Sequence, residues 1–197
     1  MKLGLITDTH LPGRIRTLDE LGPLPAEFLK SVDLILHGGD LTSPIVLDWC
    51  EQYAPVICST GNNDPIPDPR MQEIQTLELE GWKIGMAHSL EGQFRPIKDL
   101  QQMFPHPVDI MISGHTHLER LEYRDKTLMI NSGSITFPHH KEIRLGTVGT
   151  LELRPNYFKA DIFPLGETEG SPNPGTRISL EMKNGEILSS HGPVMIQ

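Results

Sequence analysis

Short apolar segments recur along the chain, and several of them stop abruptly at polar residues. Such segments cover residues 2–7, 33–37, 55–60 and 108–112. A short apolar run that is bounded by Gly, Asn or Asp is typical of a buried strand. We therefore predict a strand at each of these segments, with polar side chains presented at its carboxyl end.

Between these strands the pattern changes to helical spacing. Residues 26–32 and 96–104 repeat apolar side chains at intervals that place them on one helical face. Ser43 and Pro44 suit the N-cap and the first position of a helix, which we expect to run to about Tyr53. Three helices are therefore predicted.

Beyond residue 74, strands mostly follow one another. They are expected over residues 75–80, 82–87, 118–123, 127–131, 147–153, 157–163, 177–183 and 186–190. Gly81 and Asn184-Gly185 mark hairpin turns, while residues 11–25 and 166–176 read as loops. Because early strands alternate with helices and later strands are consecutive, we predict an α/β fold. It is a four-layer α-β-β-α sandwich with two mixed β-sheets, in one domain over residues 1–197.

Length and charge narrow the function. The 197 residues are enough for one domain with a sizeable core, and the net charge of −9 disfavours broad binding of nucleic acids. We see no signal peptide, and no apolar run approaches the ~20 residues of a membrane helix, so we expect a cytoplasmic protein without a membrane partner. Cys50 and Cys58 lie in apolar segments and are expected to be buried free thiols.

Metal-ligand side chains gather at the predicted strand ends. They are Asp8, His10, Asp40, Asn62, His88, His115 and His117. In extended backbone, residues at i and i+2 project to the same side, and ligand crevices lie beyond the carboxyl ends of strands in α/β sheets. Seven donors are too many for one tetrahedral ion but suit two ions ~3.5–4 Å apart. Asp40, on a glycine turn, is the natural bridge between them.

The donor set also selects the metal. Imidazole and carboxylate ligands without thiolate favour Mn²⁺, Fe, Zn²⁺, Co²⁺ or Ni²⁺ over Ca²⁺ or Mg²⁺. Taken singly, each residue is as compatible with a turn or a satisfied core histidine. Taken together they are not, because every one would have to fall at a strand end by coincidence.

The same residues resemble a known family. The elements Asp8-x-His10, Gly39-Asp40, Gly61-Asn62, His88 and Gly114-His115-Thr116-His117 are similar to the ordered signature of calcineurin-like metallophosphoesterases. The spacing resembles the small prokaryotic phosphodiesterase branch, and residues 131–134 resemble a later turn of that family. The resemblance implies a hydrolase that acts on a phosphate-ester small molecule or a nucleotide.

The resemblance also assigns roles. It places Asp8, His10, Asp40 and His117 on a first ion, and Asp40, Asn62, His88 and His115 on a second, with Mn²⁺ the first choice. A metal-bridging hydroxide would attack phosphorus in line. The residues expected to act in catalysis are Asp40, Asn62, Asn63 and His115.

One position departs from the family pattern. Many members carry histidine after the Gly-Asn pair, where it contacts phosphate and protonates the leaving group, whereas this chain has Asn63. An amide donates a hydrogen bond but supplies no proton at neutral pH. General acid help contributes roughly 10²–10⁴ in rate, so we predict a preference for diesters with good leaving groups. His139 or His140 replacing this acid is the less favoured alternative.

Two other functions stay open. The family includes a retromer subunit that is a protein-interaction scaffold, so this chain could be a catalytically weak or inactive member. A nucleotide-specific enzyme would need a base pocket, for which Phe104, Tyr123 and Phe137 are candidates. The strands over residues 147–190 either complete the second sheet or provide the edge of a homodimer.

Overall fold

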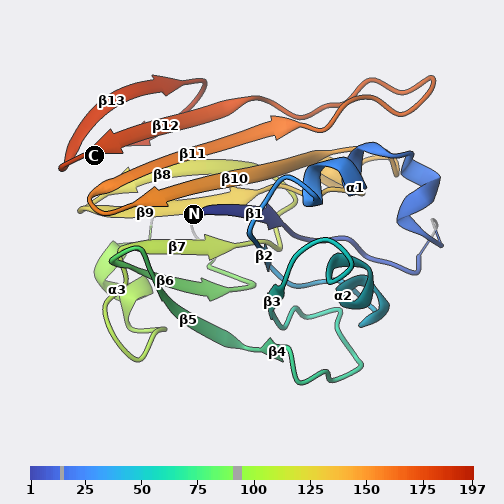
Figure 1. Ribbon diagram of the computed structural model, residues 1–197, viewed down its shortest axis with the longest axis horizontal. Helices are drawn as coiled ribbons and strands as arrows, with labels where there is room; N and C mark the ends of the chain where they lie inside the picture. Colours follow the sequence, from blue (N-terminus) through green and yellow to red (C-terminus); the bar gives the residue numbers. More distant parts are fainter. Residues whose placement is uncertain (14–15, 91–94) are drawn as a thin grey trace.

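Two mixed β-sheets stacked face to face form the body of the protein. The computed structural model describes residues 1–13, 16–90 and 95–197. Figure 1 shows the two sheets with short helices at the outside of the stack. This arrangement confirms the predicted α/β sandwich.

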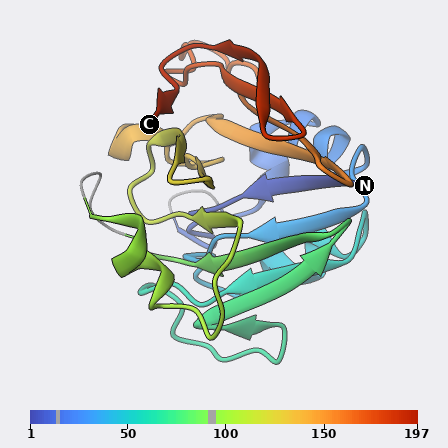
Figure 2. The ribbon, with the colours of Figure 1, turned by 90° about the vertical axis from the view of Figure 1, so that its left-hand side faces the viewer.

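The larger sheet has eight strands in the order β13-β12-β11-β10-β1-β2-β3-β4. Their bounds are β1 Lys2–Ile6, β2 Leu34–His37, β3 Val56–Ser59, β4 Met71–Gln72, β10 Thr147–Arg154, β11 Tyr157–Pro164, β12 Ile178–Lys183 and β13 Glu186–His191. The strands β1 to β4 are parallel, and the later strands add to β1 as an antiparallel ribbon. The predicted C-terminal strands therefore extend the sheet that starts at the N-terminus, and Figure 2 shows their hairpin at one edge of the molecule.

The smaller sheet has six strands in the order β14-β8-β9-β7-β6-β5. Their bounds are β5 Ile74–Leu79, β6 Trp82–Ala87, β7 Ile110–Ser113, β8 Glu119–Arg124, β9 Thr127–Ser132 and β14 Met195–Ile196. β5 and β6 form the hairpin predicted at Gly81, and β7 joins β6 in parallel. Hence β6 and β7 present their carboxyl ends together.

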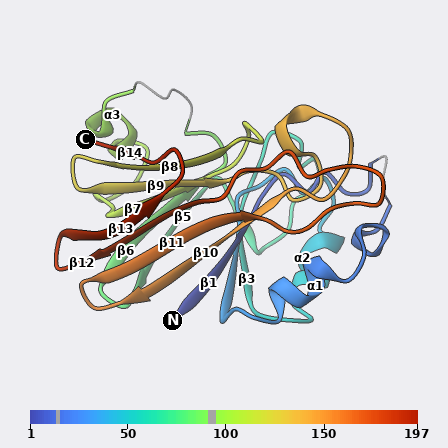
Figure 3. The same cartoon turned by 90° about the horizontal axis from the view of Figure 1, so that it is seen from above.

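Three apolar layers hold the stack together. Alternate residues of both sheets, among them Leu5, Leu36, Ile112 and Phe158, pack between the sheets. The other face of the larger sheet packs on α1 Leu24–Leu29 and α2 Ile45–Cys50, and the other face of the smaller sheet packs on α3 Ile97–Gln101. Figure 3 shows α3 on the opposite side of the stack from α1 and α2. The central strands β1, β2, β7 and β9 are therefore covered on both faces, which explains their nearly continuous apolar sequence.

The helices differ from the sequence prediction more than the strands do. All three helices are shorter than predicted, and α2 begins at Ile45 with Pro44 at its N-cap rather than Ser43. The two-residue strands β4 and β14 were not predicted. The loop over 11–25 contains a 3₁₀ turn at Leu18–Leu21 and the start of α1, and its residues 14 and 15 lie outside the described residues.

The loop over 166–176 is tied to the body of the protein by hydrogen bonds. The Asn173 side-chain amide donates to the Gly146 carbonyl, outside the loop, at 2.7 Å and to the Gly166 carbonyl at the start of the loop at 2.8 Å. Cys50 and Cys58 are buried free thiols, as predicted, and burial raises the pKa of Cys50 to about 12. Among the described residues, no helix is long and apolar enough to span a membrane.

Candidate metal centre

Five strand ends from both sheets meet at one place. Asp8 and His10 follow β1, Asp40 follows β2, and Asn62 follows β3. His88 follows β6 of the smaller sheet, and His115 and His117 follow β7. Within each sheet these strands are parallel, so their carboxyl ends open toward the same side. All seven metal ligands predicted from the sequence are brought into two neighbouring groups.

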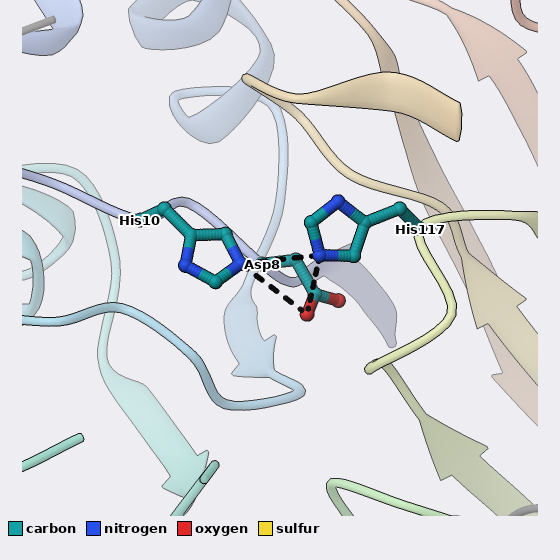
Figure 4. A group of neighbouring side chains, drawn as sticks. All are labelled: Asp8, His10 and His117. Carbon is teal, nitrogen blue, oxygen red and sulfur yellow. Dashed lines mark hydrogen bonds and ion pairs between the residues drawn. The ribbon is translucent and has the colours of Figure 1, made fainter. Parts of the chain in front are cut away.

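Asp8, His10 and His117 form the first group, with ligand atoms within 4.8 Å of one another. The Nε2 atoms of His10 and His117 lie 3.1 Å apart, and Asp8 Oδ1 lies 3.9 and 3.4 Å from them. Figure 4 shows the two imidazoles and the carboxylate pointing toward one another. Asp8 and His117 are buried, whereas a quarter of the His10 side chain reaches solvent.

Asp40, His88 and His115 form the second group, again with ligand atoms within 4.8 Å. Asn62 belongs to it by position, because its Oδ1 lies 2.9 Å from His115 Nδ1 and 3.2 Å from His88 Nε2. His88 Nε2 lies 3.4 Å from Asp40 Oδ1. Two imidazoles, one carboxylate and one amide oxygen therefore face a common point.

The Asp40 carboxylate connects the two groups. Its Oδ1 faces His88, while its Oδ2 lies 3.7 Å from His10 Nε2 in the first group. A carboxylate that offers one oxygen to each of two sites is the geometry of a bridging ligand in two-metal centres. The donor chemistry of these residues therefore fits two divalent ions.

Backbone carbonyls fix the orientation of two of the imidazoles. His88 Nδ1 donates to the Gly38 carbonyl and His117 Nδ1 donates to the Phe137 carbonyl, each at 2.8 Å. Because a carbonyl only accepts, Nδ1 carries the proton, and when either ring is neutral the lone pair of its Nε2 faces the cluster. This is the outer-shell arrangement that orients metal-binding histidines.

The backbone at these residues is not extended. Asp8, His10, Asp40, His115 and His117 all have positive φ, between 43° and 70°. Non-glycine residues rarely adopt this conformation, and it persists where the surrounding structure imposes it. The expectation that His115 and His117 project to one side from extended backbone is therefore wrong, and the two histidines join different groups.

Asp40 is held by hydrogen bonds from Asn63. The Asn63 backbone N–H donates to Asp40 Oδ1 and its side-chain amide donates to Asp40 Oδ2, both at 2.7 Å. Burial favours a higher pKa for Asp40, but hydrogen bonds from His88 and Asn63 outweigh it and hold the pKa below its ordinary value. Asp40 is therefore a carboxylate at neutral pH, as a metal ligand requires.

The histidines respond differently to this environment. Burial lowers the pKa of His10. In His88 and His117 burial acts in the same direction, but the nearby carboxylates of Asp40 and Asp8 outweigh it and raise the pKa. His37 is fully buried, with its pKa lowered to about 4 by desolvation, and accepts from Gly39 N–H through Nδ1. It is a neutral supporting residue behind the turn that carries Asp40.

A cavity of about 550 Å³ opens over the two groups. Its walls include His10, Asp40, Asn62, Asn63, His115, His117, Phe137 and His140. His140 stacks on His117 with ring centroids 3.8 Å apart, whereas His139 lies 2.6 Å from Glu119 Oε2 and outside this lining. Of the three aromatic candidates for a base pocket, Phe137 borders the cavity, while Phe104 packs under α3 and Tyr123 packs between the sheets.

Some supporting residues have no signal in the sequence. Thr7 Oγ1 donates to Asp8 Oδ2 at 2.7 Å, and Ser134 Oγ donates to the Asp8 carbonyl at 2.7 Å. Thr136 Oγ1 donates to the Thr9 carbonyl at 2.7 Å. Ser134 lies in the turn over residues 131–134 that resembles the family pattern, whereas nothing in the sequence marks Thr7 or Thr136 as supporting residues, because hydroxyl side chains are common throughout the chain.

Comparison with known proteins agrees with this geometry. Residues 1–156 match the sequence profile of the calcineurin-like phosphoesterase superfamily domain. A probable metallophosphoesterase of Methanothermobacter thermautotrophicus is 35% identical over 165 residues, which cover 82% of this chain and 90% of that protein. Phosphodiesterase MJ0936 of Methanocaldococcus jannaschii is 26% identical over 148 residues, which cover 68% and 83%.

Solved structures show the same fold. Vps29 of Entamoeba histolytica, crystallised with Zn²⁺, superposes with a TM-score of 0.72 at 20% identity. The match covers 93% of this chain and 99% of that one. The fold of most of this chain is thus an arrangement found elsewhere.

Proposed function

Because the chain belongs to the calcineurin-like phosphoesterase superfamily, we propose that it is a dinuclear metal-dependent phosphodiesterase. The observation that carries the proposal is the Asp40 carboxylate between two Asp and His groups. We assign Asp8, His10, Asp40 and His117 to one ion, and Asp40, Asn62, His88 and His115 to the other.

Two bound divalent cations, with Mn²⁺ the favoured one, would activate water for in-line attack on phosphorus and neutralise charge on the phosphoryl oxygens. The chain itself supplies orientation. Gly38 and Phe137 carbonyls fix two imidazoles, Asn63 fixes the Asp40 carboxylate, and the cavity over His115 and Asn62 leaves room for the ester.

Asn63 supports a preference for diesters. Its side-chain amide donates to Asp40 and has no proton to give a departing alkoxide. An aryl leaving group needs little protonation, so its ester is hydrolysed well without a general acid. An alkyl monoester needs that acid and would lose roughly 10²–10⁴ in rate.

The test is hydrolysis of bis(p-nitrophenyl) phosphate, a diester with an aryl leaving group, and of hexyl phosphate, an alkyl monoester, by chelator-treated protein with Mn²⁺ added back. We expect Mn²⁺-dependent turnover of the diester, faster than that of the monoester. Asp40→Asn should lower it about a hundredfold or more, because one shared ligand serves both ions. Asp125→Asn in the exposed β8–β9 turn, where positive φ suits asparagine, is the matched control and should retain full activity.

Each contrary result has a distinct meaning. Faster turnover of the monoester would contradict the argument from Asn63 and leave the metal centre standing. No turnover of either ester with Mn²⁺, Fe²⁺, Zn²⁺, Co²⁺ or Ni²⁺ would favour the scaffold alternative.

A further inference from the structure

A second cavity lies beside the metal centre, and we infer that it binds an anionic group on one arm of the substrate through Arg120. The inference rests on the proposed phosphodiesterase function and adds a specificity subsite to it. The cavity has a volume of about 590 Å³, and its lining includes His115, His140, Leu118 and Arg120.

The cavities flank the reaction centre on two sides. His115 and His140 line both the central cavity and the second one, so the two meet at these side chains. A third hollow, of about 400 Å³, shares His10, Asn62 and Asn63 with the central cavity. A phosphodiester carries two organic arms, and the two flanking spaces offer one place for each.

The second cavity has a polar floor built by strand register. Ser113 on β7 is paired with Asn131 on β9, and Asn131 is paired with Arg120 on β8. All three border the cavity, and Leu118, which is 47% exposed, adds an apolar wall. Such a space suits a ligand with an apolar body and a charged end.

Arg120 shares its carboxylate partner with a second arginine, while the other carboxylate of the cavity lining, Glu119, is directed to His139. Arg120 Nε lies 2.6 Å from Glu122 Oε1, and Arg124 Nε lies 2.9 Å from Glu122 Oε2, so two guanidinium groups share one carboxylate. Within the described part of the chain, Arg120 Nη2 is buried and has no acceptor. Arg120 is also one of the residues that border the cavity, so a carboxylate or phosphate bound there would meet a guanidinium that shares its only carboxylate partner in the described structure with Arg124.

The test compares two diesters that differ only in the charge of the retained arm. They are p-nitrophenyl phenyl phosphate and p-nitrophenyl 4-carboxyphenyl phosphate, which release the same chromophore. Wild-type protein loaded with Mn²⁺ should have a lower KM for the carboxylated ester. Arg120→Gln should raise that KM about tenfold to a hundredfold, the range for a charge-assisted hydrogen bond, and change the KM of the phenyl ester by less than about twofold.

Matched variants separate this role from fold and from net charge. Glu122 keeps Arg124 as its partner in Arg120→Gln, so the ion pair that it needs survives. Arg120→Lys keeps the charge and should recover part of the selectivity. Lys183→Gln removes a positive charge from an exposed position on β12 and should change neither KM. Unfolding midpoints in urea check that each variant is folded.

The outcomes distinguish the two proposals. If wild type hydrolyses both esters with equal KM, or if Arg120→Gln raises both KM values alike, the anionic subsite is wrong and the phosphodiesterase function stands. If wild type hydrolyses neither ester with Mn²⁺, the phosphodiesterase proposal fails, and the subsite fails with it.

Discussion

At the scale of single residues, the Asp64 carboxylate anchors two loops that carry metal-ligand side chains. Its Oδ2 accepts the backbone N–H of Asp40 at 2.9 Å and of Gly61 at 2.7 Å, and its Oδ1 accepts that of Thr42 at 2.8 Å. The loop after β2 and the loop after β3 are thus tied to one side chain. Asp64 belongs to neither metal-ligand group, yet it sets the separation of the loops that carry Asp40 and Asn62.

Asp64→Ala should weaken both the metal centre and the fold. Removing the acceptor of three backbone donors should lower the free energy of unfolding by about 3 kcal/mol and the Mn²⁺ affinity by roughly 10–100-fold. Urea denaturation and calorimetric Mn²⁺ titration measure the two effects. Asp19→Ala, at an exposed position of the 3₁₀ turn, is the control, and equal Mn²⁺ affinity in both variants would refute this role of Asp64.

The sequence predicts which residues gather here better than it predicts how they do so. Strand-end positions identify Asp8, Asp40 and His88, because apolar runs and the residues that stop them are local features. The left-handed backbone at His115 and His117 is imposed by contacts distant in the sequence, such as the His115 N–H that donates to Asp8 at 3.0 Å. No local pattern encodes such a contact.

At the scale of elements, the layer formed by α3 packs on the smaller sheet at a glycine of β6. A Cβ placed on Gly85 of β6 would lie 2.5 Å from Phe104 Cε1 and 2.6 Å from its Cδ1. Phe104 follows α3 and is buried with Leu100 and Ile97 of that helix. The missing side chain in the strand therefore makes room for the ring that closes this layer.

Gly85→Ala should overpack this contact and lower the free energy of unfolding by about 1–3 kcal/mol. Phe104→Leu should also destabilise, because it removes buried ring atoms. In the double variant the smaller side chain accommodates the new methyl group. Its loss of unfolding free energy should therefore be smaller than the sum of the two single-variant losses by about 0.5–3 kcal/mol. Urea unfolding of the four proteins measures this coupling, and strict additivity would show that the two residues do not share the space.

The strands that the sequence failed to predict, β4 and β14, are defined only by their pairing with a neighbouring strand. β4 consists of Met71 and Gln72, which pair with Cys58 and Ser59, and β14 pairs with β8 in the same way. Two residues are too few for any periodicity, so nothing local distinguishes them from a loop. The predicted helices are too long because apolar residues continue at helical spacing past the last helical turn, into loops that are also packed.

At the scale of the whole molecule, the metal centre joins the two sheets. β1, β2 and β3 contribute ligands from the larger sheet, while β6 and β7 contribute them from the smaller one. Cations bound here would hold both sheets together at one edge, where Asp40 and His88 otherwise meet directly. We accordingly propose that residues 1–197 unfold as a single domain, with cation binding linked to the folding of both sheets.

This linkage predicts a pH-dependent thermal stabilisation by Mn²⁺. Burial opposes protonation of His88 and His117, but carboxylate neighbours raise their pKa above 6.5 in the metal-free protein. Protonation of these rings therefore stabilises the metal-free fold below pH 6.5, and that contribution is lost as the pH rises through the raised pKa values. Mn²⁺ needs the neutral rings, so its binding strengthens over the same interval.

Saturating Mn²⁺ should consequently raise Tm more at pH 8 than at pH 6. At a hundred times the dissociation constant the stabilisation is about 2.7 kcal/mol, which for a chain of this length corresponds to roughly 5–10 °C. Calorimetric scans at both pH values, with Ca²⁺ at equal concentration as the control for ionic strength, measure the difference. The Asp40→Asn variant should show almost no shift, because it loses the ligand common to both ions. A Mn²⁺ shift that is equal at the two pH values would contradict the competition between proton and cation, and two separate transitions would contradict the single domain.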